Sequence, residues 1–127
     1  MTERDYADAA AFRAELRLFL RRAEEAAREH GLTPRQHLLL LMIAGAERQS
    51  STVSGLVERL QLTQSAVTEL VQRAEDAGFV TRTPSPTDGR VVDLRLTEEG
   101  ERRLALVHDA LGPERHQLKL LVERLDL

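Results

Sequence analysis

The chain has 127 residues, enough for one compact domain but too few for two ordinary ones. Hydrophobic residues make up 42% and charged residues 31%, a balance typical of a helix-rich globular protein, and the 3% of aromatic residues argues against a stacking platform for single-stranded nucleic acid. The absence of cysteine excludes disulfides, thiolate zinc sites and thiol nucleophiles, and the formal net charge of −3 gives no general attraction to phosphate.

The amino-terminal segment, residues 1–11, carries acids and an arginine but lacks the apolar stretch of a signal peptide. The longest apolar run, residues 38–46, is too short to cross a bilayer. We therefore expect a cytoplasmic protein. The sequence also lacks a glycine-rich phosphate loop, a zinc-hydrolase pair of histidines and a nucleophile with an evident base beside it, so we expect neither an enzyme nor a bound cofactor.

The first predicted element is an amphipathic helix over about residues 8–29, ended by Gly31. Its apolar residues recur at steps of three and four, which places them on one stripe. The other face carries arginines and glutamates and is interpreted as a solvated surface. The apolar stripe consists of Phe12, Leu16, Phe19, Leu20, Ala23 and Ala27.

The second predicted helix starts at a cap formed by Thr33, with Pro34 in the first turn and Gln36 able to reach back to the cap. It continues to about residue 46. Because residues 38–44 are apolar around most of the helix, we expect a buried central helix. Residues 47–51 are predicted to be a polar connection.

Two further capped helices follow, separated by a tight turn. Thr52 caps a short helix over about residues 53–60, which Gly55 weakens by about 1 kcal/mol relative to alanine. Thr63 caps the next helix, which runs to about residue 77 and ends at Gly78. This arrangement predicts a helix-turn-helix.

A hairpin and two more helices complete the chain. Residues 80–83 and 90–96 are β-like, and residues 84–89 are rich in turn formers, which predicts a wing. In the second strand Val92, Leu94 and Leu96 alternate against Val91, Asp93 and Arg95. Thr97 caps a further helix, and a break at residues 112–113 separates it from a last amphipathic helix. The apolar stripe of that helix consists of Leu118, Leu121, Val122 and Leu125.

The helix after Thr63 has one aliphatic face and one polar face. A polar face on an isolated helix is more often simply solvated, but the combination of two capped helices, a tight turn and a wing favours contact with a major groove. There Gln72 can pair with adenine and Glu69 can accept from cytosine, while Arg73 lies within reach of a phosphate or a guanine. The predicted DNA-binding residues of this helix are Gln64, Ser65, Thr68, Glu69, Gln72 and Arg73.

The predicted wing adds two residues. Arg90 follows the turn at Asp88 and Gly89, so it can project into a narrow minor groove, where the negative potential is concentrated. The alternative is a local ion pair with Asp88. The two interpretations are compatible, because such a pair can aim the guanidinium group.

At this point the sequence resembles the MarR family of bacterial transcription regulators, over about residues 32–100. The resemblance rests on four stretches, of which the last two are the most specific. Gly89 stands where an arginine is common in the family, and residues 55–57 stand where Glu-Leu-Ala is usual. The four stretches are Leu32-Thr33 with Gln36; Leu62-Thr63 with Ser65, Val67 and Thr68; Ala77-Gly78-Phe79-Val80 with Arg82; and Asp88-Gly89-Arg90 leading to Leu96-Thr97-Glu98-Glu99-Gly100.

The resemblance implies a mainly α-helical fold with a small β-hairpin wing, in which residues 1–127 form a single MarR-type domain. About residues 33–97 would be the winged-helix DNA-binding core, and about residues 6–30 and 98–127 the dimerisation helices. It implies that Asp88 and Arg90 match the family's wing pair, and that a homodimer represses transcription from a near-palindromic operator until a small, often aromatic, molecule releases it. The separate apolar stripes at the two ends of the chain independently favour a dimer.

Two alternatives remain open. A winged-helix module that binds protein instead of DNA would suit the acidic net charge better. A metal-responsive variant of the regulator would require histidines to converge in a dimer, and the residues that could contribute are Glu24, His30, His37, His108 and His116.

Overall fold

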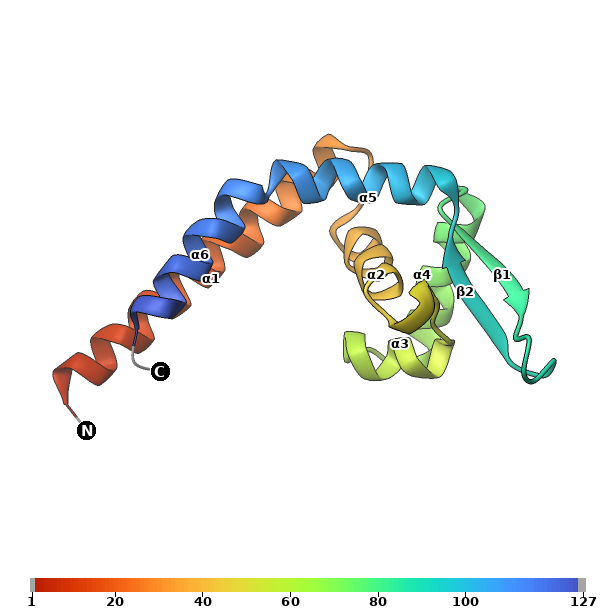
Figure 1. The fold of residues 1–127 in the computed structure, drawn as a ribbon, viewed down its shortest axis with the longest axis horizontal. Helices are drawn as coiled ribbons and strands as arrows, with labels where there is room; N and C mark the ends of the chain where they lie inside the picture. Colours follow the sequence, from red (N-terminus) through yellow and green to blue (C-terminus); the bar gives the residue numbers. More distant parts are fainter. Residues whose placement is uncertain (1, 126–127) are drawn as a thin grey trace.

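The computed structural model describes residues 2–125, which are mainly helical and carry one small hairpin, as predicted. Figure 1 shows a bent molecule in which α1 and α6 lie side by side as an arm, while α2, α3, α4 and the hairpin form a winged unit beneath α5. No helix among residues 2–125 is long and apolar enough to cross a membrane. In chain order the elements are α1 (Glu3–Glu29), α2 (Pro34–Ala44), the 3-10 helix η1 (Glu47–Gln49), α3 (Val53–Leu60), α4 (Gln64–Asp76), β1 (Val80–Pro84), β2 (Val92–Leu96), α5 (Glu98–Ala110) and α6 (Gly112–Arg124).

Threonine caps begin the helices of the winged unit and α5, as the sequence predicts. In each case the threonine hydroxyl accepts a hydrogen bond, 3.1 Å long, from the backbone amide three residues later. The bond satisfies one of the amides that an α-helix leaves unpaired at its start. The capping residues are Thr33, Thr52, Thr63 and Thr97.

The first helix starts earlier than predicted, at Glu3 instead of residue 8. Thr2 and Asp5 form a capping box in which the Thr2 backbone amide donates to the Asp5 carboxylate at 2.9 Å. The apolar periodicity begins only at Phe12, so periodicity alone could not detect this first turn.

The central helix α2 is not buried all round, so the prediction is wrong for one of its faces. Leu39, Leu40 and Ile43 are fully buried, but Leu38 and Leu41 are 40% and 38% exposed. The helix also ends at Ala44 instead of residue 46, and the expected polar connection contains the single 3-10 turn η1. The exposed face looks toward α1 and α5 across a pocket described below.

The core lies where α2, α3, α4, the hairpin and α5 meet. Its members come from both the helix-turn-helix and the strand, so the winged unit folds around one shared set of aliphatic side chains. The largest fully buried side chains are Leu39, Leu40, Ile43, Leu56, Val67, Val71, Leu94 and Val107.

The hairpin is an antiparallel pair in which Val80 faces Leu96 and Pro84 faces Val92. The second strand starts at Val92 and not at residue 90, which places Arg90 in the turn. The alternation predicted an inward Val92, but this residue is 42% exposed because it lies at the wing end, beyond the core. Ser51 adds a short third segment, since its backbone exchanges hydrogen bonds of 3.1 and 2.7 Å with Leu94.

The predicted break at residues 112–113 is a bend between two consecutive helices, not a loop. Leu111 ends α5 with φ −95° and ψ 4°, and α6 starts at the next residue. Figure 1 shows that α6 then runs antiparallel to α1. The two helices that carry the predicted apolar stripes therefore lie against each other within one chain, which buries Leu121 but leaves Leu20 and Val122 of those stripes exposed.

Candidate nucleic-acid interface

The polar face of α4 is presented to solvent because its aliphatic face anchors the helix. Val67, Val71 and Ala74 are fully buried on one side. On the other side, six side chains line one shallow depression of the protein surface. All six are the residues predicted from the sequence on this helix: Gln64, Ser65, Thr68, Glu69, Gln72 and Arg73.

Two contacts along α4 hold the longer polar side chains. The Arg73 guanidinium lies 2.7 Å from the Glu69 carboxylate, and the Gln72 amide donates to the Asp76 carboxylate at 3.0 Å. Both pairs are one helical turn apart and exposed, so each contributes only about 0.3–0.5 kcal/mol. Contacts of this strength can be exchanged for a base edge or a phosphate.

The wing tip shows both features that the sequence left open for Arg90. The Asp88 carboxylate accepts from the Arg90 backbone amide at 3.0 Å and from the Arg90 side chain at 3.4 Å. The Arg90 side chain is nevertheless 93% exposed. The ion pair therefore restrains the guanidinium without removing it from solvent.

The predicted residues form two groups, one on α4 and one at the tip of the hairpin (Figure 1). A contact that was not singled out in the sequence fixes their relative placement. Arg82 on β1 lies 3.1 Å from the Glu75 carboxylate on α4, across the turn at Gly78. The only available signal was the opposite charge on either side of that turn.

A separate pocket of about 500 Å³ lies between α1, α2, α5 and α6. Burial, and to a smaller extent the positive charge of nearby His108, lower the pKa of His37 below its ordinary value of 6.5. The lining is mostly apolar, but it also includes Arg35, Arg115 and the acidic Glu24. The lining residues are Phe19, Leu20, Ala23, Glu24, Pro34, Arg35, His37, Leu38, Leu41, His108, Leu111 and Arg115.

The structure brings together three of the five residues considered for a metal site, because Glu24, His37 and His108 line this pocket. His116 lies on α6 outside it, and His30 ends α1. Within residues 2–125 no group of three or more histidine or acidic side chains is arranged to hold a metal ion.

A model of the MarR family matches residues 30–91 of this chain. The chain is 37% identical over 78 residues to the HTH-type transcriptional repressor MdtR of Bacillus subtilis (strain 168), a match covering 61% of this chain and 48% of that protein. It is 34% identical over 67 residues to the HTH-type transcriptional repressor IacR of Pseudomonas putida, covering 53% and 38%. The chain thus matches about half the length or less of these curated relatives.

Solved structures match a larger part of this chain than the curated relatives do. Wild-type MarR from E. coli in its apo form superimposes with a TM-score of 0.72 at 25% identity, covering 93% of this chain and 84% of that one. A mutant MarR from E. coli complexed with operator DNA gives a TM-score of 0.70 at 25% identity, covering 93% and 81%. The resemblance noted from the sequence is confirmed: the chain is similar to MarR-family regulators and has the winged-helix fold of the solved MarR structures.

Proposed function

We propose that the chain is a sequence-specific DNA-binding transcription regulator that acts in the cytoplasm as a homodimer on a near-palindromic operator. The observation that carries this proposal is the two-sided α4, whose aliphatic side is buried while six polar side chains line its exposed side. A helix that is anchored in this way can enter a major groove with its hydrogen-bonding groups outward. The operator complex of the structurally similar mutant MarR supports this use of the fold.

Five of the six side chains on that face have a role in the proposal. Gln72 pairs with an adenine edge and Glu69 accepts from the amino group of a cytosine. Arg73, released from Glu69, reaches a guanine or a phosphate. Ser65 and Thr68 are short and lie near the amino end of α4, where the helix can approach the bases closely.

The wing supplies a second contact. Arg90 projects from the tip with its guanidinium in solvent, and Asp88 restrains its direction. A guanidinium held in this way fits a narrow minor groove beside the major groove that α4 occupies.

The homodimer is proposed from the arm of α1 and α6. Large apolar side chains of the arm are exposed to solvent, and a second copy related by a two-fold axis can bury those on one of its faces. Such a dimer would place its two α4 helices, the recognition helices of the proposal, roughly 34 Å apart, which is one turn of DNA. The exposed apolar residues of the arm are Tyr6, Leu18, Leu20, Leu120 and Val122.

We further propose that the protein represses transcription by occupying its operator and is released by a small aromatic effector bound in the 500 Å³ pocket. The pocket is of a size suited to a small molecule, and its lining is mostly apolar. Arg35 and Arg115, which outnumber the single acid Glu24 in the lining, favour an effector that carries an anionic group. Because helices of both the arm and the winged unit line the pocket, a bound molecule can change their relative placement.

Selection of bound sequences from a pool of random duplexes tests the DNA-binding proposal. The expected product is a palindrome whose half-sites lie about 10 base pairs apart, centre to centre. Affinity for it should fall steeply as salt rises, because phosphate contacts release counterions. A chain that prefers no duplex, but binds a protein partner with little salt dependence, would be the protein-interaction module considered above.

Leu38→Gln tests the effector proposal. Leu38 is partly exposed and lines the pocket, so a polar side chain there should weaken binding of small aromatic acids without unfolding the protein. Thermal stabilisation by such acids, and their release of the selected duplex, should both decline in the variant. Affinity for the duplex without an acid should be unchanged. Equal responses of the variant and the original chain would reject the pocket as the effector site.

A further inference from the structure

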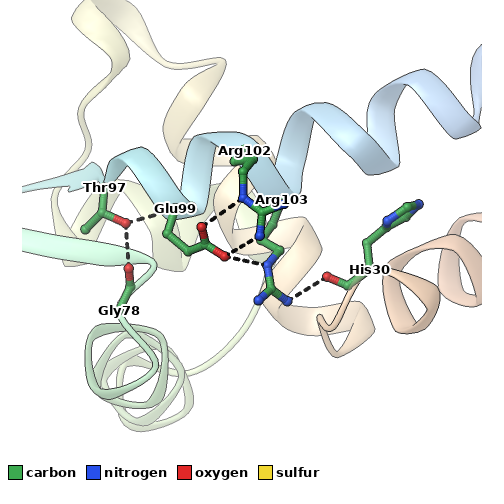
Figure 2. Close-up of polar contacts among 7 residues, drawn as sticks. His30, Gly78, Thr97, Glu99, Arg102 and Arg103 are labelled. Carbon is green, nitrogen blue, oxygen red and sulfur yellow. Dashed lines mark hydrogen bonds and ion pairs between the residues drawn. The ribbon is translucent and has the colours of Figure 1, made fainter.

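Three segments that are distant in sequence meet at the side chain of Arg103 on α5 (Figure 2). One guanidinium nitrogen donates to the backbone carbonyl of His30, at the end of α1, at 3.0 Å. Another donates to the Glu99 carboxylate, one turn earlier on α5, at 2.7 Å. The guanidinium carbon also lies 5.5 Å from the centre of the Phe79 ring, which is within the range of a cation–π contact.

The start of α5 is in direct contact with the turn that follows α4. Thr97 donates from its hydroxyl to the Gly78 carbonyl at 2.5 Å, and its amide donates to the Phe79 carbonyl at 2.9 Å. A Cβ on Gly100 would collide with that same Phe79 carbonyl. The end of the recognition helix therefore cannot shift without moving the start of α5.

The end of α1 also contacts Arg103, here through the end of a flexible side chain. Gly31 has a φ of +77°, and a side chain at this position would collide with the Arg103 guanidinium. The His30 carbonyl that Arg103 reaches is one that the helix leaves unpaired at its carboxyl end. Arg103 thus supplies a partner that the local backbone lacks.

Glu99 keeps the guanidinium in place. It accepts two hydrogen bonds from Arg102 and one from Arg103, and these bonds lower its pKa to about 2, so the carboxylate is ionised at neutral pH. Within residues 2–125 the Arg102 side chain bonds only to Glu99, whereas Arg103 also contacts His30 and Phe79. The planar guanidinium can make these divergent bonds together, which a lysine ammonium on a single stem would not reproduce.

We propose that Arg103 is a positioning residue for DNA binding, which fixes the angle between the winged unit and the arm of α1 and α6. The winged unit joins the arm through α5 and through the connection from α1 to α2, and Arg103 ties those two routes to each other. In a dimer built on the arm, this angle sets the separation of the two recognition helices. The inference rests on the proposed function. It assigns to Arg103 an effect on the preferred half-site spacing and no effect on the preferred base sequence.

The matched substitutions R103M and R102M test the proposal on the full-length protein. Both remove one positive charge and one partner of Glu99, but only R103M releases α1 and Phe79. Affinity is measured for the selected duplex and for duplexes with one base pair added or removed between the half-sites. The spacing preference is the ratio of the affinity for the selected duplex to the affinity for a duplex of altered spacing. In R103M this ratio should fall roughly fivefold or more, as expected for a site that couples two units, while R102M should keep the wild-type ratio. Base preference within each half-site should be the same in all three proteins.

Amide hydrogen exchange gives a readout that needs no DNA. R103M should increase exchange at the end of α1 and at the turn after α4 together, including the amides of Leu32 and Phe79, and R102M should change neither. R103K, which keeps the charge, serves in place of R103M if the latter does not fold, with the same expected loss of spacing preference. A spacing profile like that of the wild type in the Arg103 variant would overturn this inference alone. A wild-type protein that prefers no duplex would overturn the proposed function and this inference with it.

Discussion

Replacing Arg90 with alanine separates the contribution of the wing to DNA affinity from its contribution to stability. The side chain is 93% exposed and its one ion pair, with Asp88, is 3.4 Å long. An exposed pair of this kind is worth about 0–1 kcal/mol, so the free energy of unfolding should change by less than about 1 kcal/mol. Arg90→Ala should therefore fold like the original chain.

DNA binding should respond much more strongly. A guanidinium inserted in a groove contributes about 1 to 3 kcal/mol, which corresponds to a rise in Kd of roughly fivefold to 150-fold. If the contact also neutralises one phosphate, the slope of log affinity against log salt should become shallower by about 0.9. Fluorescence anisotropy with the selected duplex, repeated over a series of salt concentrations, measures both quantities.

Asp88→Asn is the matched control, because it weakens the same ion pair but leaves the arginine in place. It should not lower the affinity as Arg90→Ala does, because the guanidinium can still reach the groove and no longer has a carboxylate to leave. An Arg90→Ala variant with an unchanged Kd and an unchanged salt slope would refute the role of the wing that we infer from its exposure and direction.

Three further outcomes follow from the geometry. Gln72→Ala should relax the preference at one base position in each half-site, which repeated duplex selection detects; an unaltered preference would discard the orientation assigned to α4. Gly100→Ala should lower the thermal midpoint, by about 1–3 kcal/mol in stability, because the added methyl group must displace the Phe79 carbonyl. A higher midpoint would mean that the usual gain from alanine in a helix prevails over the collision. Because His37 has a lowered pKa, the folded state binds fewer protons than the unfolded state near pH 6.5, so the free energy of unfolding should fall as the pH drops through this value. Urea denaturation should show a weaker pH dependence for His37→Gln, and identical slopes would contradict this account.

Helix starts were predictable because a cap is a local signal. Thr33, Thr52, Thr63 and Thr97 each precede an apolar periodicity in the sequence, and each accepts from the amide three residues on in the structure. The exposure of the polar face of α4 was predictable for the same reason, since the spacing of residues within one helix determines which side chains share a face.

Contacts between segments that are far apart in the chain could not be predicted in this way. The bonds between Ser51 and Leu94, and between Arg103 and His30, join positions 43 and 73 residues apart and leave no periodic trace in the sequence. The exposed face of α2 was missed for a related reason. An apolar side chain indicates only that some surface should cover it, and Leu38 faces a pocket instead of the core.

The acidic net charge, which at first argues against a DNA-binding protein, has a structural counterpart at the proposed interface. Arg73, Arg82 and Arg90 each lie within 3.4 Å of a carboxylate of their own chain. A phosphate that displaces such a carboxylate gains less than one that meets an unpaired arginine, because one anion replaces another, so attraction to arbitrary DNA should be reduced. A correct base sequence adds hydrogen bonds to the polar face of α4 that no phosphate supplies. On the proposed function, the paired arginines therefore lower affinity for all duplexes alike and leave discrimination to the base contacts, which is the balance that a regulator needs when it searches a large excess of unrelated sequence.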